Sequence, residues 1–256
     1  MKADPIAALP PHACPEREAA FLDAARAGAL DPIVWAPVEC SRAGRRLVVY
    51  VTADALQLAG VRITTTHVTA QRLADLLGGH LLTSRVADLA HDQAGARLPP
   101  QTQTPDAAMS DTHRMLEHSS AVDAALARAG AAPGVLVADP GKDWVCTPRL
   151  RGRPDRAANF GWHTSRGPFR SAGGASVLQP VGLAHNLDHT DYSQVVRLVH
   201  ADCELDGEVR PLAEIALDPL LHALVSDEGP VELRHPGVPA LVVADTIPAP
   251  APEASC

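Results

Sequence analysis

Patterns typical of helices fill the first half of the chain, and patterns typical of strands fill the second half. Residues 15–130 contain four stretches with apolar side chains at helical spacing, whereas residues 131–245 contain short apolar runs separated by turn residues. This segregation favours an α+β fold, because a parallel sheet needs helices and strands to alternate. We therefore expect one α+β domain with a mainly antiparallel sheet in the C-terminal half, packed by helices from the N-terminal half.

The expected domain spans residues 15–245. Residues 1–14 and 246–256 are rich in proline and alanine, which predicts disorder at both ends. The segment 98–105 reads LPPQTQTP and predicts a linker or a long surface loop.

Local signals place the individual elements. Helices are expected over 15–28, from an N-cap at Thr69 to 78, from Thr83 or Ser84 onward, and over 111–128. The strongest helix signal is Asp218-Pro219 followed by Gly229, which predicts a helix between them. Strands are expected at 35–38, 46–51, 61–63, 134–138, 144–146, 158–163, 176–181, 192–203 and 240–243, with a hairpin turn at 205–208.

Charge and composition exclude several classes of protein. Thirty acidic residues against 22 basic ones give a net charge of −8, which argues against a nucleic-acid partner. The sequence has no apolar run long enough for a membrane span and no glycine-rich phosphate loop. Its start lacks the apolar segment of a signal peptide, and its five cysteines have no CxxC spacing. We expect a cytoplasmic protein without a disulfide framework, a structural zinc site or a cofactor.

Aromatic residues are scarce and unevenly distributed. The chain has eight, and five of them fall between residues 144 and 192: Trp144, Phe160, Trp162, Phe169 and Tyr192. Aromatic side chains often line ligand pockets, so this window is where we expect a site. Lys142, at its edge, is one of two lysines in the chain and the only one beyond position 2.

Polar residues that can carry chemistry lie in three segments of this window. Lys142 and Asp143 follow a predicted turn, and His163 ends a predicted strand in which Gly161 leaves space beside it. The third segment, residues 185–194, is the densest: two histidines, two aspartates, a tyrosine and a serine occur within nine residues.

These residues allow two kinds of catalysis. In the first, Ser193 or Tyr192 is the nucleophile or hydroxyl donor. His163 and His185 are then the acid–base candidates, and Asp143 or Asp191 orients the imidazole. In the second, His163, His185 and Asp191 hold a divalent metal ion. The substrate-binding candidates are Lys142 and Arg197, which could hold a carboxylate, together with Trp144, Trp162 and Gln179.

The same elements resemble a functionally uncharacterised bacterial family. Its members carry, in order, a KKD element, a YGWH element, a QP dipeptide and a DYSHG element followed by RLV. The matching positions are Lys142-Asp143, Phe160-Gly161-Trp162-His163, Gln179-Pro180, His185, Asp191-Tyr192-Ser193 and Arg197-Leu198-Val199. The resemblance covers roughly residues 33–229.

Two departures from this family bear on chemistry. Phe160 stands where the family has tyrosine, and Gln194-Val195 stand where it has His-Gly, so Ser193 has no histidine directly after it. The DYSHG element is also similar to the L,D-transpeptidase signature. The catalytic cysteine of that signature is absent here, where the position is Val196, so the similarity implies no transpeptidase activity.

The resulting expectation is a hydrolase or acyl-transfer enzyme that acts on a small molecule or a peptide. A metal-dependent enzyme is one alternative. A non-catalytic ligand-binding or accessory protein of a bacterial biosynthetic pathway is the other.

Overall fold

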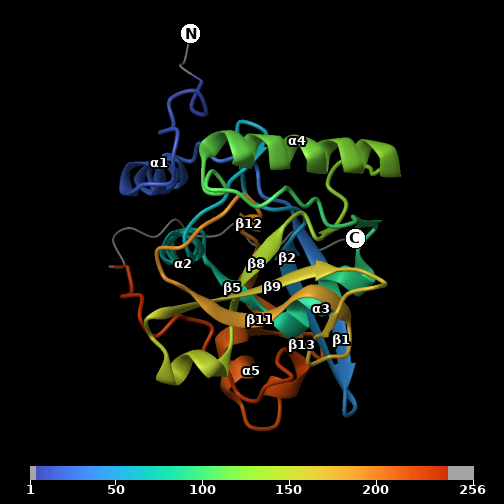
Figure 1. The fold of residues 1–256 in the computed structure, drawn as a ribbon. Coiled ribbons are helices and arrows are strands. Elements are labelled where there is room, and N and C mark those ends of the chain that lie inside the picture. Colours follow the sequence, from blue (N-terminus) through green and yellow to red (C-terminus); the bar gives the residue numbers. More distant parts are fainter. Residues whose placement is uncertain (1–3, 242–256) are drawn as a thin grey trace.

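One large, mostly antiparallel sheet organises the fold in the computed structural model, which describes residues 4–241 (Figure 1). Its strands follow the order β1 (Trp35–Arg42), β2 (Arg45–Thr52), β13 (Leu198–Leu205), β5 (Gly79–Thr83), β8 (Lys142–Cys146), β9 (Arg156–His163), β11 (Ser176–Asn186) and β10 (Phe169–Arg170). Two short strands join it, β12 (Gln194–Val195) on β8 and β14 (Glu208–Pro211) on β13. The α+β class is confirmed, and the first half of the chain contributes β1, β2 and β5 to the sheet.

Two pairings within this sheet are parallel. β5 and β12 both run parallel to β8, whereas the other neighbours are antiparallel. Two further sheets have two strands each: β3 (Gln57–Leu58) with β4 (Val61–Arg62), and β6 (Ala96–Arg97) with β7 (Val137–Ala138).

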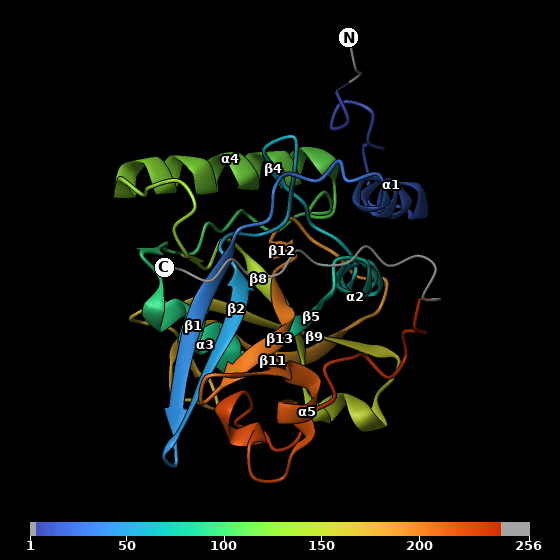
Figure 2. The ribbon, with the colours of Figure 1, turned by 180° about the vertical axis from the view of Figure 1, so that it is seen from behind.

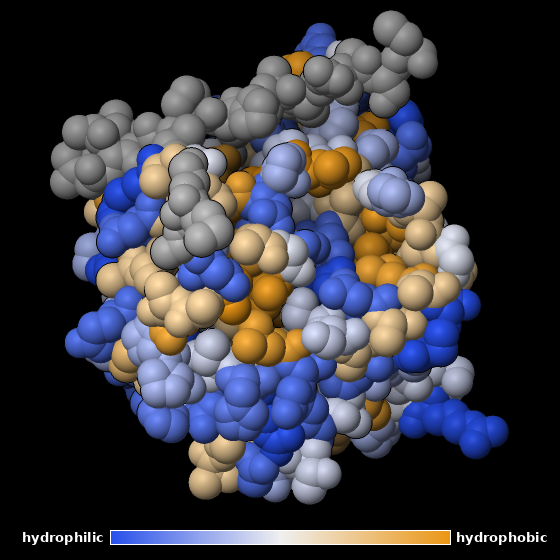
Figure 3. All heavy atoms as spheres, turned by 90° about the horizontal axis from the view of Figure 1, so that it is seen from above, coloured by the Kyte–Doolittle hydropathy of each residue, from blue (hydrophilic) through white to orange (hydrophobic). Residues whose placement is uncertain are grey.

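The helices surround the sheet and cover its ends. They are α1 (Pro15–Arg26), α2 (His67–Leu76), α3 (Ser84–Gln93), α4 (Thr112–Ala129) and α5 (Leu212–Leu217), with 3₁₀ turns at Pro148–Gly152 and His222–Leu224. Both ribbon views place α1 and α4 at one end of the molecule and α5 at the other (Figures 1 and 2). Figure 3 looks onto the α1–α4 end, where apolar patches are interrupted by hydrophilic residues.

Local capping explains where several helices begin and end. The Thr83 hydroxyl accepts the N–H of Val86 at the start of α3, as expected, and Gly130 ends α4 with a φ of 63°. The N-cap of α2 is Thr66 rather than Thr69. Its hydroxyl accepts the N–H of Thr69, so the helix begins one turn earlier than the sequence predicts.

The prediction of a helix between Asp218 and Gly229 is wrong. Oδ1 of Asp218 accepts the N–H groups of residues 220 and 221, and the chain then forms only a 3₁₀ turn. The carbonyl of Val225 accepts the Thr83 hydroxyl, and that of Leu224 accepts Nε of Arg85 at 3.1 Å. These carbonyls therefore bind α3 instead of continuing a helix of their own.

The chain ends are only partly described. Residues 4–14 form turns, and Ile6 and Leu9 pack against the core. Ala240 and Leu241 lie outside any strand, whereas the rest of the strand predicted at 240–243 and the tail at 246–256 lie beyond the described residues. The segment 98–105 contains no helix or strand, in agreement with the predicted loop.

The interior is mainly aliphatic, as the scarcity of aromatic residues requires. Trp144 and Phe160 are the largest aromatic side chains fully buried in the central strands. In residues 4–241 the four described cysteines are free, and no helix is long and apolar enough to cross a membrane.

Candidate functional site

β8 and β9 bring together residues from the three segments that the sequence singled out. In their antiparallel register Lys142 lies opposite Gly161, and Asp143 lies opposite Phe160. β12 places Gln194 beside Lys142. Because successive side chains of a strand point to opposite faces, the side chains of Lys142 and Asp143 lie on opposite faces of the sheet and contact different residues. The polar side chains around these strands form two separate clusters.

The first group, which we call the histidine–aspartate cluster, consists of Asp88, His91, Asp139 and His163. Nδ1 of His163 lies 2.9 Å from Oδ1 of Asp139, and Nε2 lies 2.8 Å from Oδ1 of Asp88. Carboxylate oxygens accept hydrogen bonds, so both ring nitrogens carry protons and His163 is an imidazolium. Burial lowers the pKa of His163, but the hydrogen bonds to Asp139 and Asp88 outweigh this effect and raise the pKa to about 9.

Asp139 joins the two histidines of this cluster. Its Oδ1 also accepts the backbone N–H of His163 at 3.0 Å, and its Oδ2 lies 2.8 Å from Nδ1 of His91. Burial raises the pKa of Asp139, but the hydrogen bonds from His163 and His91 hold it well below its usual range. Its φ of 56° lies in the left-handed region, which aspartate tolerates better than most residues, at the turn before β8.

Asp88 and His91 come from the same face of α3, three residues apart. The second carboxylate oxygen of Asp88 accepts the hydroxyl of Ser171 at 2.6 Å. The ring of His91 stacks on that of His163 with the centroids 4.2 Å apart. Helix α3 thus supplies one carboxylate and one imidazole to a single polar cluster.

The cluster opens onto a surface groove of about 580 Å³ that His91 and His163 line. The His91 side chain is 21% exposed, and among residues 4–241 no group hydrogen-bonds to its Nε2. Arg97 and the segment 98–100 form another part of the wall. Nε of Arg97 donates to the carbonyl of His91 at 2.9 Å, so its guanidinium is held beside the cluster.

Hydrogen bonds from the backbone N–H groups of Leu98 and Gln103 hold the loop 98–105 on either side of the residues that line the groove. Leu98 donates its N–H to the carbonyl of Ala138, and Gln103 donates its N–H to the hydroxyl of Tyr192 at 2.8 Å. The predicted nucleophile or hydroxyl donor Tyr192 thus holds the loop in place through its Oη.

The second group, the lysine–aspartate cluster, consists of Lys142, His185, His189, Asp191 and Ser193. Nζ of Lys142 lies 3.1 Å from Oδ2 of Asp191. Ser193 is fully buried, and both its N–H and its Oγ donate to Oδ1 of Asp191, at 2.7 and 2.5 Å. The structure therefore does not form the predicted Ser193–histidine pair, because the hydroxyl is bound to a carboxylate.

The two histidines of this cluster stack on each other with the centroids 3.7 Å apart. Burial, the neighbouring His189 and the charge of Lys142 lower the pKa of His185 to about 4. His185 therefore remains neutral at pH 7.

The predicted metal trio of His163, His185 and Asp191 is divided between the two clusters. His163 is held by Asp139 and Asp88, whereas Asp191 is paired with Lys142. A different trio, His91, Asp139 and His163, has possible ligand atoms within 4.8 Å of one another. These are residue types that zinc accepts, but a metal ion would have to replace hydrogen bonds that the cluster already makes.

The two predicted carboxylate-binding cations already have partners inside the protein. Lys142 pairs with Asp191 and lies 5.2 Å from the ring centre of Trp162. Nη1 of Arg197 lies 3.5 Å from Oδ2 of Asp143, and both side chains are buried. Burial raises the pKa of Asp143 to about 6, although the charge of Arg197 opposes the rise.

The other side chains predicted to contact a substrate, Trp144, Gln179 and Trp162, make their contacts within the protein. Trp144 is a core residue whose Nε1 donates to the carbonyl of Thr65 at 2.9 Å. Nε2 of Gln179 donates to the carbonyl of Pro180 at 2.9 Å. The buried Trp162, with a φ of 57°, places its ring beside Lys142.

The sequence pattern points to His163 but not to its neighbours Asp88, His91 and Asp139. The signal for the first two is present, since an aspartate and a histidine three residues apart share one face of the predicted helix. Asp139 follows a predicted strand and belongs to a predicted turn, where an aspartate is common for local reasons. Only the folded chain shows that its carboxylate binds two histidines.

Comparison with known proteins gives no further guide to this site: no family model, no curated protein and no solved structure matches the chain.

Proposed function

We propose that the protein is a hydrolase that cleaves an ester or amide bond of a small molecule or peptide bound in the groove. The observation that carries this proposal is the position of His91. Its Nδ1 is held by Asp139 at 2.8 Å while the side chain lines the groove. A carboxylate on one nitrogen fixes the tautomer in which the other nitrogen can accept a proton.

Charge in the cluster supports a basic role for His91. Asp88 and Asp139 carry two negative charges, and the imidazolium of His163 compensates one of them. A proton taken up by His91 would bring the net charge of the four groups from −1 to 0, although it would place a second cation 4.2 Å from the imidazolium of His163. This arrangement favours proton transfer from a bound water to Nε2 of His91.

The proposed reaction balances with water as the nucleophile. His91 removes a proton from water, and the resulting hydroxide adds to the carbonyl carbon of the substrate. The bond to the leaving group then breaks, and the proton on His91 passes to the leaving oxygen or nitrogen. Arg97 lines the same groove, and its Nε and Nη2 donate to the carbonyls of His91 and Asp92, which leaves Nη1 to donate to the carbonyl oxygen as negative charge develops on it.

A substrate panel with two variants tests this proposal. Short-chain p-nitrophenyl esters and amino-acid p-nitroanilides are offered to the wild type, to His91→Ala and to His113→Ala. His113 is an exposed histidine of α4 and serves as the control. We expect His91→Ala to lose about a hundredfold in kcat/KM, as is typical when a general base is removed. Unchanged hydrolysis by His91→Ala would contradict the proposal.

A metal-dependent hydrolase is the second candidate, because possible ligand atoms of His91, Asp139 and His163 lie within 4.8 Å of one another. In that case EDTA abolishes activity, Zn²⁺ or Mn²⁺ restores it, and the purified protein contains metal in stoichiometric amount. Under the metal-free mechanism EDTA leaves the rate unchanged. The same His91→Ala variant then separates the two, since it loses metal binding only in the metal-dependent case.

A further inference from the structure

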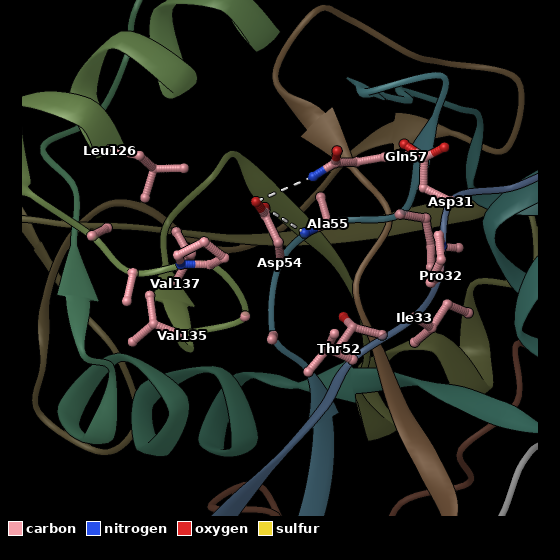
Figure 4. A pocket seen from close by; sticks show the side chains of 17 residues that line it. Asp31, Pro32, Ile33, Thr52, Asp54, Ala55, Gln57, Leu126, Val135 and Val137 are labelled. Carbon is pink, nitrogen blue, oxygen red and sulfur yellow. Dashed lines mark hydrogen bonds between the residues drawn. The ribbon is translucent and has the colours of Figure 1, made fainter.

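A second hollow lies between the end of β2 and the segment that follows α4 (Figure 4). Its volume is about 300 Å³, at the lower end of the range that holds small ligands. Its walls come from residues 31–34, 52–57 and 131–135, with Leu126 of α4 and Val137 of β7. None of these residues belongs to the histidine–aspartate cluster, so the hollow is separate from the groove.

Much of the wall is apolar. Ile33, Leu126 and Val135 present aliphatic side chains to the hollow, and Figure 4 shows them around its space. Val34, at the edge, is 49% exposed although it is aliphatic. An apolar body of a ligand would cover this surface and remove it from water.

The polar groups of the hollow are mainly acceptors. Asp31 accepts the N–H of Ala59 at 3.1 Å and that of Gly60 at 2.6 Å, and no basic side chain in residues 4–241 forms an ion pair with it. Asp54 differs, since Arg62 lies 2.6 Å from its Oδ2. Asp31 therefore brings a negative charge without an ion-pair partner to a hollow whose other polar side chains are Thr52, Gln57 and the paired Asp54.

Two further features make the hollow electrostatically negative. Its lining contains no lysine, arginine or histidine. The C-terminal end of α4 also lies at this wall, because residues 131–135 follow it directly, and a helix carries partial negative charge at that end. A ligand that is apolar and positively charged matches this combination, whereas an anion does not.

We propose that this hollow binds a small organic cation, specifically a primary ammonium group on an aryl or alkyl body. The ammonium group lies against Asp31, and the apolar body lies against Leu126 and Val135. The site is independent of hydrolysis in the groove, so its test does not rest on the proposed function.

The test is calorimetric titration of the full chain at pH 7 with three compounds of similar size and different charge. We expect phenethylamine to bind at least tenfold more tightly than 2-phenylethanol, and 3-phenylpropanoate to bind more weakly than both. Asp31→Asn should remove the preference for the amine. Asp202→Asn, which changes an exposed carboxylate on β13, should retain it.

A second variant keeps the test valid if Asp31→Asn disturbs the turn at Ala59 and Gly60. Val34→Lys adds a positive charge at the exposed edge of the hollow and leaves the bonds of Asp31 in place. It should weaken binding of phenethylamine at least fivefold and leave that of 2-phenylethanol within twofold. Equal binding of the amine and the alcohol by the wild type would overturn the proposal, as would a charge preference that survives both substitutions.

Discussion

The two polar clusters beside β8 and β9 both contain histidine and aspartate but place the positive charge differently. In the histidine–aspartate cluster the charge resides on His163, whose two nitrogens both face carboxylates. In the lysine–aspartate cluster it resides on Lys142, and the nearby His185 is neutral because burial and that charge lower its pKa to about 4. Burial lowers the pKa of both histidines, and only His163 has hydrogen bonds to carboxylates that outweigh this effect.

The clusters also differ in their access to solvent. His91 lines the groove, whereas Ser193 is fully buried and bound to Asp191. We therefore expect substitution of the groove-lining His91 or its partner Asp139 to change the rate of catalysis, and substitutions in the second cluster to change stability. Four experiments test these differences in charge and in access.

Lys142→Met should have the largest effect on stability. It leaves the carboxylate of Asp191 buried without its cation, and breaking a buried ion pair in this way costs about 3 kcal/mol or more. Urea denaturation measures the change. Adding Asp191→Asn to Lys142→Met should recover part of the loss, because the uncompensated charge is then removed. A loss below about 1 kcal/mol would indicate a weak pair of the kind found at surfaces.

Asp139→Asn should reduce the rate about a hundredfold, because the residue that orients a catalytic imidazole no longer presents a carboxylate to it. The variant should also lower the pKa of His163, which keeps Asp88 as its only carboxylate partner. Imidazole NMR spectra recorded against pH report that shift. If Asp139→Asn has a normal rate and an unchanged His163 titration, then Asp139 neither orients His91 nor raises the pKa of His163.

The pH dependence of stability should have opposite signs for the two histidines. The folded-state pKa of His163 is about 9, above the unfolded value of about 6.5, so its contribution is complete below pH 6.5 and is lost as the pH rises toward 9. The folded-state pKa of His185 is about 4, so its contribution is present above pH 6.5 and is lost as the pH falls toward 4.

The effect should be about 3 kcal/mol for His163 and smaller for the half-buried His185, where solvent screens the interaction. Unfolding free energies of His163→Gln and His185→Gln, measured against pH and compared with the wild type, isolate the two contributions. His163→Gln should flatten the alkaline limb, and His185→Gln should flatten the acid limb. If both variants flatten the same limb of the pH profile, the opposite charge states assigned to His163 and His185 are contradicted.

Ser193→Ala should have the smallest effect. It removes one hydrogen bond to Asp191, which is worth about 1 kcal/mol, and should leave kcat/KM unchanged. Thermal denaturation and the substrate panel measure the two quantities. A large loss of activity in a folded Ser193→Ala protein would instead restore the serine as a nucleophile.

The sequence predicted the class of fold and most helices and strands, because these follow from local periodicity and caps. The caps at Thr83 and Gly130 are examples in which the deciding hydrogen bond is local. The helix predicted after Asp218 shows the opposite case. There the carbonyls of Leu224 and Val225 bind side chains of residues 83–85, about 140 positions away, which no local pattern reveals.

The candidate site was only partly predictable for the same reason. His163 stood out through its position after Gly161 and Trp162, but its partners Asp88 and Asp139 lie 75 and 24 residues away in sequence. The pairing of Ser193 with Asp191 spans only two residues, yet the sequence pattern equally allowed a histidine partner. A residue type shows what a side chain can bind, and only the fold shows which partner reaches it.

The anchoring of the loop at Leu98 and Gln103 has a consequence for how this molecule can diversify. Between those two points, Pro99 and Pro100 line the groove, while the residues of the histidine–aspartate cluster lie on α3, on β9 and before β8. Exchange of these two residues can alter which molecules fit the groove, while the histidine–aspartate cluster keeps its position. The selectivity of the proposed hydrolase can therefore change through one short stretch, without a change in its acid–base groups.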